Sequence, residues 1–523
     1  MIKKIILLTL ICAFALSACG GGEPEQTVPP DVRAMRTVTP PSASAQPVSG
    51  GDLTLSMRHP LTLNPLLNED ETVDRVLSLI FEKLFILDAE LRPVHNPALL
   101  TGSAVSADGK TWTLDVRQDA RWQDGSAITA EDVRFSIEYL KNTSPMDAVY
   151  KECAQNILSA QVSGGSVRVN LIQPYAQMGY MLRFPIIPSG YYRNAGEASD
   201  KQMNPVGSGP YKLDGRDMLQ ISLTASEQPT GGAAYIQNIK VIITASDEDD
   251  VNAFIQGVTD AAPVTSSGWS AARAASQNFY ETEYVSGYFD FIGFNFQNPA
   301  VAKRETRLAV AHALPYADIL QTVYKNAAVL APTPISPASW LHDEMVAHYE
   351  YNTQAASDYL RAAELAGTEL RVLVNSENAE RVRTAELLAR NLAMIGAAVD
   401  LRSLPWDEYV QALQNGDFDI FLGGYKLQTA PDLGFMLHSE SEANYQRYQN
   451  ANMDGFLAEA HAASEEAAIL HAYSQLQNYI AYEMPIIGLV FRKSALLTEP
   501  AVQGPVDVRL DDVFYNIEEW YLQ

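Results

Sequence analysis

Residues that could carry covalent chemistry do not occur at the spacings that such chemistry needs. A serine nucleophile elbow requires Gly-x-Ser-x-Gly between a strand and a helix, and the nearest match, VGSGPY at 206–211, has a different spacing. A phosphate loop and a dinucleotide-binding glycine fingerprint are both absent from the sequence. The sequence therefore predicts a protein that is not an enzyme and needs no cofactor.

The residues that could bind a metal do not occur at the spacings of known metal sites either. His342 and His348 are six residues apart in HDEMVAH, about 240° around a helix, so one helical face could not present both to a metal. The acidic run SDEDDVN at 246–252 lacks the glycine at which a calcium-binding loop turns. Acidic groups of this kind instead favour the first turn of a helix. We therefore expect no metal site.

The charge and length of the chain limit the possible classes of ligand and the number of domains. The sequence has 37 Lys and Arg against 63 Asp and Glu, a net charge of −26, whereas a nucleic-acid ligand needs basic groups to neutralise its phosphates. We therefore expect no nucleic-acid partner, and the acidity is typical of a soluble, exposed surface. With 523 residues, 47% of them hydrophobic, the chain can bury a large core and divide into two or three domains.

The first residues have the pattern of an export signal. Lys3 and Lys4 precede the apolar run IILLTLICAFAL, which is followed by SAC. The pattern resembles a bacterial lipobox, and this resemblance implies cleavage before Cys19 and lipid attachment to that cysteine. A plain signal peptide and an uncleaved membrane helix are the alternatives, although the run is shorter than the roughly 18–20 residues that span a bilayer.

Residues 1–18 are therefore predicted to be a lipoprotein signal peptide, and residues 19–50 a disordered tether. The tether is rich in Gly, Pro, Ser and Thr and has hardly any large apolar residue. Cys153 is the only other cysteine expected after processing, so an internal disulfide is not predicted. The protein should be extracytoplasmic, lipid-anchored to the outer face of the cell membrane, or in the periplasm if the cell has a second membrane.

From Gly51 onward the pattern is that of a folded α/β protein. Alternating apolar residues predict strands, for example in DLTLSM at 52–57 and YFDFIGFNFQ at 288–297. TVDRVLSLIFEKLFIL at 72–87 instead has apolar residues at helical spacing. Between residues 305 and 425 helical and strand patterns alternate, which is typical of a sheet with helices on both faces.

The segment WQDGSAITAEDVRFSIEYL at 122–140 combines a turn, a helix cap and an amphipathic helix. Asp124 and Gly125 suit the turn, and Thr129 with Asp132 suits a capping box. The predicted buried stripe of the helix contains Val133, Ile137 and Leu140. Nothing in this segment requires chemistry, so we interpret it as scaffold.

Together with the strand before it, this segment resembles the signature of the family 5 extracytoplasmic solute-binding proteins of ABC transporters, the oligopeptide, dipeptide and nickel binder group. Other segments resemble the family in its own order along the chain. They are the block at 61–112 that contains LNP, NPVGSGPYKL at 204–213, FNFQNPAVAKRETRLAVAHALPYADIL at 294–320 and YIAYEMPIIGLVFRKSALL at 479–497. The resemblance covers nearly everything from Gly51 to Gln523.

This resemblance implies an α/β, two-lobed, periplasmic-binding-protein-like fold (type II, cluster C) with an extra inserted domain. Domain I would combine residues 51–67, 188–263 and 485–523. Domain II would be residues 68–187, and domain III residues 264–484. The two lobes would close on a ligand about a hinge.

The resemblance also implies a ligand cleft between domains I and III. The candidate residues before the C-terminal third of the chain are Arg58, His59, Pro60, Ser266, Ser267, Trp269 and Tyr288. Arg58 would pair with a ligand carboxylate, or merely with an acid of the protein. Trp269 and Tyr288, which begins the aromatic strand, could stack on a ligand, and core packing is the alternative for both rings.

The segment GYKLQTAPDLGFML at 424–437 departs from the family. Peptide-binding relatives have a motif similar to GW.ADY.DP..FL, in which the Asp pairs with the free amino terminus of the ligand. Tyr425 matches the Trp, but Gln428 stands where the Asp is expected, and an amide cannot stabilise a buried ammonium as a carboxylate does. Asp432, one helical turn away, could substitute, although the family has Pro there.

The sequence therefore predicts the substrate-binding lipoprotein of an ABC importer, which captures a peptide or peptide-like solute and delivers it to the permease. We expect a monomer whose partners are the solute, the permease and ATPase subunits, and the membrane through its lipid. A non-peptide ligand such as an oligosaccharide or a metal chelate, and a ligand-sensing lipoprotein without a transporter, are alternatives. An extracytoplasmic hydrolase is a more distant one.

Overall fold

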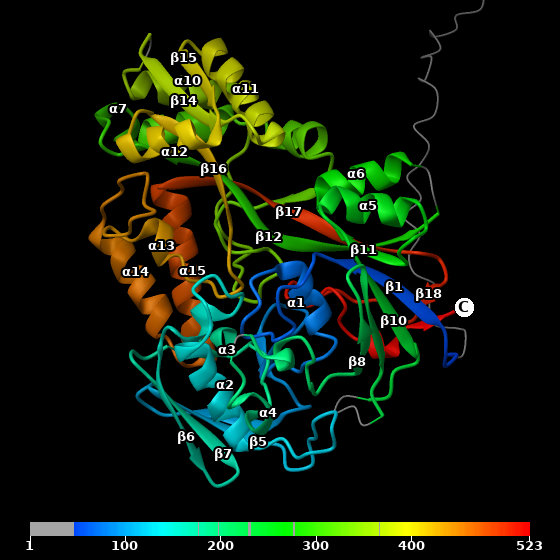
Figure 1. Ribbon diagram of the computed structural model, residues 1–523. Helices are drawn as coiled ribbons and strands as arrows, with labels where there is room; N and C mark the ends of the chain where they lie inside the picture. Colours follow the sequence, from blue (N-terminus) through cyan, green and yellow to red (C-terminus); the bar gives the residue numbers. More distant parts are fainter. Residues whose placement is uncertain (1–46, 176, 197, 228–231, 276–277, 366) are drawn as a thin grey trace, which may run out of the picture. The chain divides into compact units, whose positions relative to one another are not determined.

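The computed structural model describes residues 47–523 apart from 176, 197, 228–231, 276–277 and 366 (Figure 1). The predicted signal peptide, Cys19 and the tether up to residue 46 lie outside this part of the chain. Within it, no helix has both the length and the apolar character needed to cross a membrane.

A four-stranded sheet joins the start of the described chain to residues some 160–190 positions later. Its strands, in spatial order, are β1 (Asp52–Met57), β10 (Asn238–Ile243), β9 (Gln220–Ala225) and β8 (Tyr211–Arg216). β1 pairs with β10 in parallel, and the other pairs are antiparallel. Leu53, Leu55 and Met57 are fully buried, so DLTLSM forms the predicted strand with one face on the core.

A second four-stranded sheet is entirely antiparallel and packs against one long helix. The strands, in spatial order, are β4 (Leu100–Val105), β5 (Thr111–Val116), β7 (Ser166–Leu171) and β6 (Ile157–Ser163). The helix is α2 (Ala130–Asn142), which begins at the predicted capping box of Thr129 and Asp132. Its stripe of Val133, Ile137 and Leu140 is fully buried, and Gly125 has the positive φ of +86° that the turn needs. The interpretation of this segment as scaffold therefore fits its structure.

The helical pattern at 72–87 does not give one long helix. α1 (Glu71–Leu77) ends early, and the chain then turns into β2 (Phe85–Leu87), which pairs with β3 (Pro93–His95). The carbonyl of Ile80 accepts hydrogen bonds from the backbone N–H groups of Ser208 (2.9 Å) and Gly209 (2.8 Å). A Cβ at Gly207 would lie 1.9 Å from that carbonyl oxygen, so only glycine permits this docking. The VGSGPY turn, which is distant in sequence, thus occupies the Ile80 carbonyl that a longer helix would have used for its own hydrogen bonds.

The second half of the chain builds a seven-stranded sheet. In spatial order its strands are β11 (Ala261–Val264), β17 (Ile486–Thr498), β12 (Tyr280–Phe294), β16 (Ile420–Lys426), β14 (Glu369–Asn375) and β15 (Ala398–Leu404), with β13 (Ala328–Leu330) also paired to β17. β14, β15 and β16 run parallel, whereas β12 and β17 run antiparallel to their neighbours.

Helices cover both faces of this sheet, as the alternating pattern predicts. One face packs on α8 (Arg304–Ala313), α10 (Thr353–Ala362) and α11 (Ala379–Met394) through strand residues such as Ile420 and Leu422. Phe421 points the other way and joins the core under α12 (Trp406–Asn415), α14 (Ala451–Ala462) and α15 (Glu466–Glu483). This alternation along β16 is the two-residue period of a strand buried on both faces.

β12 and β17 connect this layered region to the rest of the molecule. Figure 1 shows the two strands side by side, extending from β16 toward β11, α5 (Asp247–Ile255) and α6 (Ser266–Ala274). Within β17, Leu489 belongs to the core under α8, whereas Leu496 belongs to the core of the first two sheets. The acidic run predicted to start a helix does so, because Ser246 caps α5 and four acidic residues occupy its first turn.

The remaining elements are short. They are α3 (Met178–Met181), α4 (Ser189–Tyr192), α7 (Pro299–Ala302), α9 (Tyr316–Asp318), α13 (Gly434–Leu437), the π-helical segment η3 (Ile319–Val323), the 3₁₀ turns η1 (Lys151–Ala154), η2 (Asp200–Gln202) and η4 (Ile517–Glu519), and the strands β18 (Val502–Gln503) and β19 (Tyr521–Leu522).

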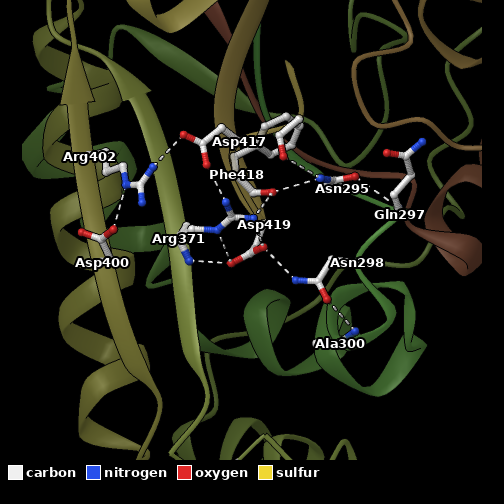
Figure 2. A network of polar contacts seen from close by, with 11 residues as sticks. Asn295, Gln297, Asn298, Ala300, Arg371, Asp400, Arg402, Asp417, Phe418 and Asp419 are labelled. Atoms are coloured by element: carbon white, nitrogen blue, oxygen red, sulfur yellow. Dashed lines mark hydrogen bonds and ion pairs between the residues drawn. The ribbon is translucent and has the colours of Figure 1, made fainter. Parts of the chain in front are cut away.

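A polar network fixes the edge of the large sheet where β14 and β16 begin (Figure 2). Asp419 is 3% exposed and accepts hydrogen bonds from the backbone N–H (2.8 Å) and guanidinium (2.8 Å) of Arg371 and from Asn298 Nδ2 (2.7 Å). Asn295 donates to the carbonyl oxygen of Phe418 at 3.0 Å. Asn295 and Asn298 of FNFQNP thus have structural roles at the start of β16.

Candidate functional site

The carboxyl ends of β14, β15 and β16 lie at one edge of the sheet, because the three strands are parallel. Ligands of open α/β sheets bind outside the carboxyl ends of such strands. The exposed side chains that follow these ends include Trp406, which is 54% exposed, and Gln428. This edge is therefore the candidate site for a ligand.

The start of α1 faces this edge. Lys426, the last residue of β16, forms hydrogen-bonded ion pairs with both carboxylate oxygens of Glu71, the first residue of α1. The Lys426 ammonium also lies 5.7 Å from the ring centroid of Tyr288. Tyr288 is 40% exposed and lies opposite Lys426 where β12 pairs with β16. An ammonium, a carboxylate and an open aromatic ring thus meet where two regions of the chain come together.

Arg75 adds a second positive charge beside this meeting point. It lies one helical turn after Glu71 in α1 and is close enough to Tyr284 of β12 to lower the pKa of that phenol, although burial raises it overall. Among the described residues, none forms an ion pair or hydrogen bond with the Arg75 guanidinium. Arg75 is therefore free to receive an anionic group of a ligand.

Arg58 is already occupied by acids of the protein. Its guanidinium donates to Asp250 (2.7 Å) and Thr244 (2.8 Å) and pairs with Asp247. Burial alone would lower the pKa of Arg58, but these carboxylates raise it. His59, next to it, is exposed and Pro60 is buried. Of the two interpretations of Arg58, pairing with protein acids matches the structure.

Trp269 lies in a core and not on an open wall. It is 2% exposed and packs with Val251, Phe254 and Val264, while the Arg273 guanidinium lies 4.0 Å above its ring. Ser266 and Ser267 begin α6 on the outside of this cluster. Core packing therefore accounts for this tryptophan.

The two candidate tyrosines differ in surroundings. Tyr425 is half-buried, stacks on Phe291 with ring centroids 5.6 Å apart, and contacts the edge of Phe435 at 5.1 Å. Burial raises the pKa of Tyr425. Tyr288 does not begin its strand as predicted, because β12 starts at Tyr280 and a bulge precedes Phe289. That bulge leaves the Tyr288 ring exposed between two buried stretches.

The loop after β16 carries Gln428 and Asp432, and both are exposed. It has no helical turn between the two residues, so the predicted spacing of one helical turn is wrong. The Asp432 carboxylate accepts a hydrogen bond from the Gly434 N–H at 2.8 Å. Its charge contributes to the raised pKa of Tyr175, which burial dominates. The Asp432 carboxylate therefore lies near Tyr175, and its charge acts on Tyr473 as well.

Contacts between distant segments hold this loop in place. Arg183 donates to Thr429 of the loop and forms an ion pair with Asp511 at 2.5 Å. The ring of Tyr175 stacks on His461 with centroids 4.5 Å apart. Residues from before position 190 thus contact the loop through Arg183 and α14 through Tyr175.

Sequence reasoning missed Glu71, Arg75, Trp406 and Lys426. Each is an ordinary exposed or partly exposed residue at the first or last turn of its element, and no local spacing distinguishes it. Two of them share a signal of position: Trp406 comes after the parallel strand β15, and Lys426 is the last residue of the parallel strand β16. That signal requires knowing which strands are neighbours.

The chain resembles known proteins over most of its length. Residues 95–447 match the family described as bacterial extracellular solute-binding proteins, family 5. The oligopeptide-binding protein AppA of Bacillus subtilis is 23% identical to this chain, over 99% of it and 98% of AppA.

Solved structures show the same fold. The ABC transporter substrate-binding protein CtaP of Listeria monocytogenes has a TM-score of 0.78 at 22% identity, covering 91% of this chain and 99% of CtaP. NikZ of Campylobacter jejuni in complex with Ni(L-His) has a TM-score of 0.67 at 21% identity, covering 91% and 100%. The predicted α/β fold of two-lobed periplasmic binding proteins is thus confirmed. The chain belongs to the family 5 bacterial extracellular solute-binding proteins.

Proposed function

We propose that this protein is the substrate-binding lipoprotein of an ABC importer, which captures a peptide or peptide-like solute outside the membrane. The single observation that carries the proposal is the meeting of α1 with the carboxyl end of β16 through Glu71 and Lys426. It places charged and aromatic groups from two regions of the chain around one edge of the sheet. The name of AppA as an oligopeptide-binding protein supports the peptide class.

The mechanism follows from the two long strands that cross between the regions. β12 and β17 remain paired along most of their length, with register shifts between Val285 and Phe289 and between Asp290 and Phe291. Such irregularities let a strand bend without losing its pairing. A solute that contacts both α1 and the β16 edge favours the closed arrangement of these regions, which the permease then recognises.

Anchoring and delivery complete the proposal. Lipid on Cys19 and the tether at 19–50 would keep the binding protein at the outer face of the membrane, close to the permease. The work of transport would come from the partner ATPase, so the binding protein itself performs no catalysis. The chain would act as a monomer.

The ligand class depends on Gln428. A peptide with a free amino terminus needs a carboxylate nearby, and Gln428 supplies none, while the Asp432 carboxylate lies near Tyr175 and Tyr473. Glu71 is the exposed carboxylate at the Lys426 end of the site. We therefore propose that Glu71 receives the ammonium of a peptide and that Lys426 is released on binding. A metal chelate is the second candidate, because the similar NikZ was solved with Ni(L-His).

A thermal-shift screen of residues 47–523 tests the ligand class. Paired peptides with free and acetylated amino termini are compared with oligosaccharides and nickel chelates. A ligand at one hundred times its Kd adds about 2.7 kcal/mol of stability, which is readily detected. We expect free-amine peptides to shift the melting temperature, and Glu71→Gln to remove their advantage over the acetylated forms.

Asp432→Asn is the matched control, because Asp432 is also an exposed carboxylate but lies near Tyr175 and Tyr473, and it should leave that advantage intact. If only non-peptide ligands stabilise the protein, the peptide assignment is wrong and the importer of another solute stands. If full-length lipidated protein fails to associate with any permease, the sensor alternative replaces the importer.

A further inference from the structure

A pocket of about 470 Å³ lies in the layered region, away from the carboxyl ends of β14–β16. Its walls come from α9 and η3, the end of β13, residues 347–351, and the junction between α15 and β17. None of the residues around Lys426 lines it. The pocket is therefore separate from the proposed solute site, and its volume lies in the range of small-molecule sites.

The lining is mainly apolar. Leu320, Leu330, Met484 and Ile487 contribute, and the Leu330 side chain is 38% exposed at the sheet edge. The ionisable residues of the lining, His348 and Glu350, are both exposed. Because no buried charge lines the pocket, a charged ligand would lose its hydration there without gaining a partner.

One polar group of the lining lacks a partner. Tyr316 lines the pocket, and burial raises the pKa of its phenol above the ordinary value. Among the described residues, none forms a hydrogen bond with the Tyr316 hydroxyl. By contrast, the neighbouring Tyr349 donates to the carbonyl of Ala481 at 2.9 Å. Tyr316 is partly buried, and its hydroxyl can therefore donate to a bound molecule that enters the pocket.

The backbone around the pocket is unusual on two walls. Residues 319–323 form a π-helix, a rare geometry that occurs frequently at functional sites. Met484, at the end of α15, has a left-handed backbone with φ of +51°, which is unfavourable for a residue with a side chain. The surrounding packing thus maintains a costly local geometry where it shapes the pocket.

We propose that this pocket is a second ligand site, which takes a compact neutral molecule with an aromatic or branched aliphatic body and one hydrogen-bond acceptor. The body packs on Leu320, Met484 and Ile487, and the acceptor receives the Tyr316 hydroxyl. The site does not depend on peptide binding elsewhere in the protein.

The probe for the test is 6-propionyl-2-(dimethylamino)naphthalene, a neutral naphthalene whose ketone accepts hydrogen bonds and whose emission shifts to the blue in apolar surroundings. Titration into the full chain should give a saturable, blue-shifted signal with one site per molecule. Leu320→Trp fills the pocket and should weaken binding at least tenfold. Tyr316→Phe removes only the donor and should weaken binding about three- to tenfold, the equivalent of one hydrogen bond.

Tyr482→Phe is the matched control, because Tyr482 is a nearby tyrosine, 56% exposed, outside the lining; it should bind the probe like the wild type. Should Leu320→Trp not fold by circular dichroism, Leu330→Trp at the exposed rim replaces it. The proposal is wrong if no saturable signal appears or if the pocket-filling variant binds normally. It is also wrong if Tyr288→Ala weakens the probe instead, which would place the probe beside Lys426.

Discussion

At the scale of single residues, Asp290 shows how the floor of the solute site is held. The carboxylate is 1% exposed and accepts hydrogen bonds from Arg381 of α11 (2.8 Å), Arg492 of β17 (2.7 Å) and Tyr324 (2.8 Å). It lies two residues after Tyr288 in β12. One buried acid on β12 thus links α11, β17 and Tyr324.

Asp290→Asn should destabilise the protein strongly. The variant removes the carboxylate that pairs with Arg381 and leaves Arg492 with only the longer pair to Glu380 at 3.6 Å. Removing one partner of a buried pair costs about 3–5 kcal/mol. Urea unfolding measures the change. Asp119→Asn is the control, because its pair with Arg117 is exposed and such pairs contribute little. Equal midpoints for the two variants would show that the Asp290 network is not a stabilising centre.

The ion pair of Lys426 with Glu71 should behave in the opposite way. Both side chains are about half exposed, so Lys426→Ala should change the free energy of unfolding by less than about 1 kcal/mol. The affinity for peptides with a free amino terminus should nevertheless rise several-fold, because Lys426 competes with the ligand ammonium for Glu71. This gain should become smaller at high salt, which screens exposed charges. Calorimetric titration with a stabilising solute measures this. Lys212→Ala, which removes the surface pair with Glu227, should leave the affinity unchanged.

At the scale of elements, the turn after α1 lies against the C-terminal segment, where Lys83 donates to the carbonyl of Asp511 at 3.0 Å. Glu82 and Asp512 lie at this junction. Glu82 accepts a hydrogen bond from Asn96 at 2.7 Å, and burial, together with the charges of Glu518 and Asp512, raises its pKa to about 7. Burial also raises the pKa of Asp512 to about 6, against the charge of Lys83. Glu82 is therefore partly protonated near neutral pH.

Glu82→Gln should stabilise the protein at pH 7.5 and have no such effect at pH 4.5. Between the ordinary pKa of 4.5 and the raised value of about 7, the folded protein keeps a proton that the unfolded chain releases. The contribution of Glu82 to stability therefore falls as pH rises through this window. We expect a gain of the order of 1–3 kcal/mol at pH 7.5. Urea unfolding of both proteins at several pH values measures it, and a constant difference across pH would contradict the assignment.

At the scale of the whole molecule, β12 and β17 are shared by several hydrophobic cores. Phe289 and Phe491 pack under α12 and α15, Leu489 under α8, and Leu496 in the core of the first two sheets. The two strands are thus built into the cores at both ends. Any movement between these regions must be absorbed along the strands, where the register shifts occur.

Solute binding should make residues 47–523 more compact. A ligand that contacts both α1 and the β16 edge stabilises the closed arrangement, so the radius of gyration from small-angle X-ray scattering should fall at saturation. Tyr288→Ala, which removes one aromatic contact, should require more solute for the same change. A radius of gyration that is independent of a saturating ligand would contradict hinge closure.

The sequence by itself determined the class and order of most elements. The capping box of Thr129, the buried stripe of α2 and the alternation of the aromatic strand in β12 are local properties of the chain, and all three occur as predicted. Family membership could also be predicted from the sequence. Segments such as the VGSGPY turn make close backbone contacts that only particular residues permit.

Only the tertiary structure decided which side chains meet. From the sequence, Arg58 could pair with a ligand carboxylate or with a protein acid, and the fold places Asp250 of α5 beside it. Trp269 could have been an open wall until its neighbours buried it. The pairing of Glu71 with Lys426, 355 residues apart, has no local signal at all. Periodicity reports only neighbours along one element, whereas a binding site is made by contacts between elements that are far apart in the chain.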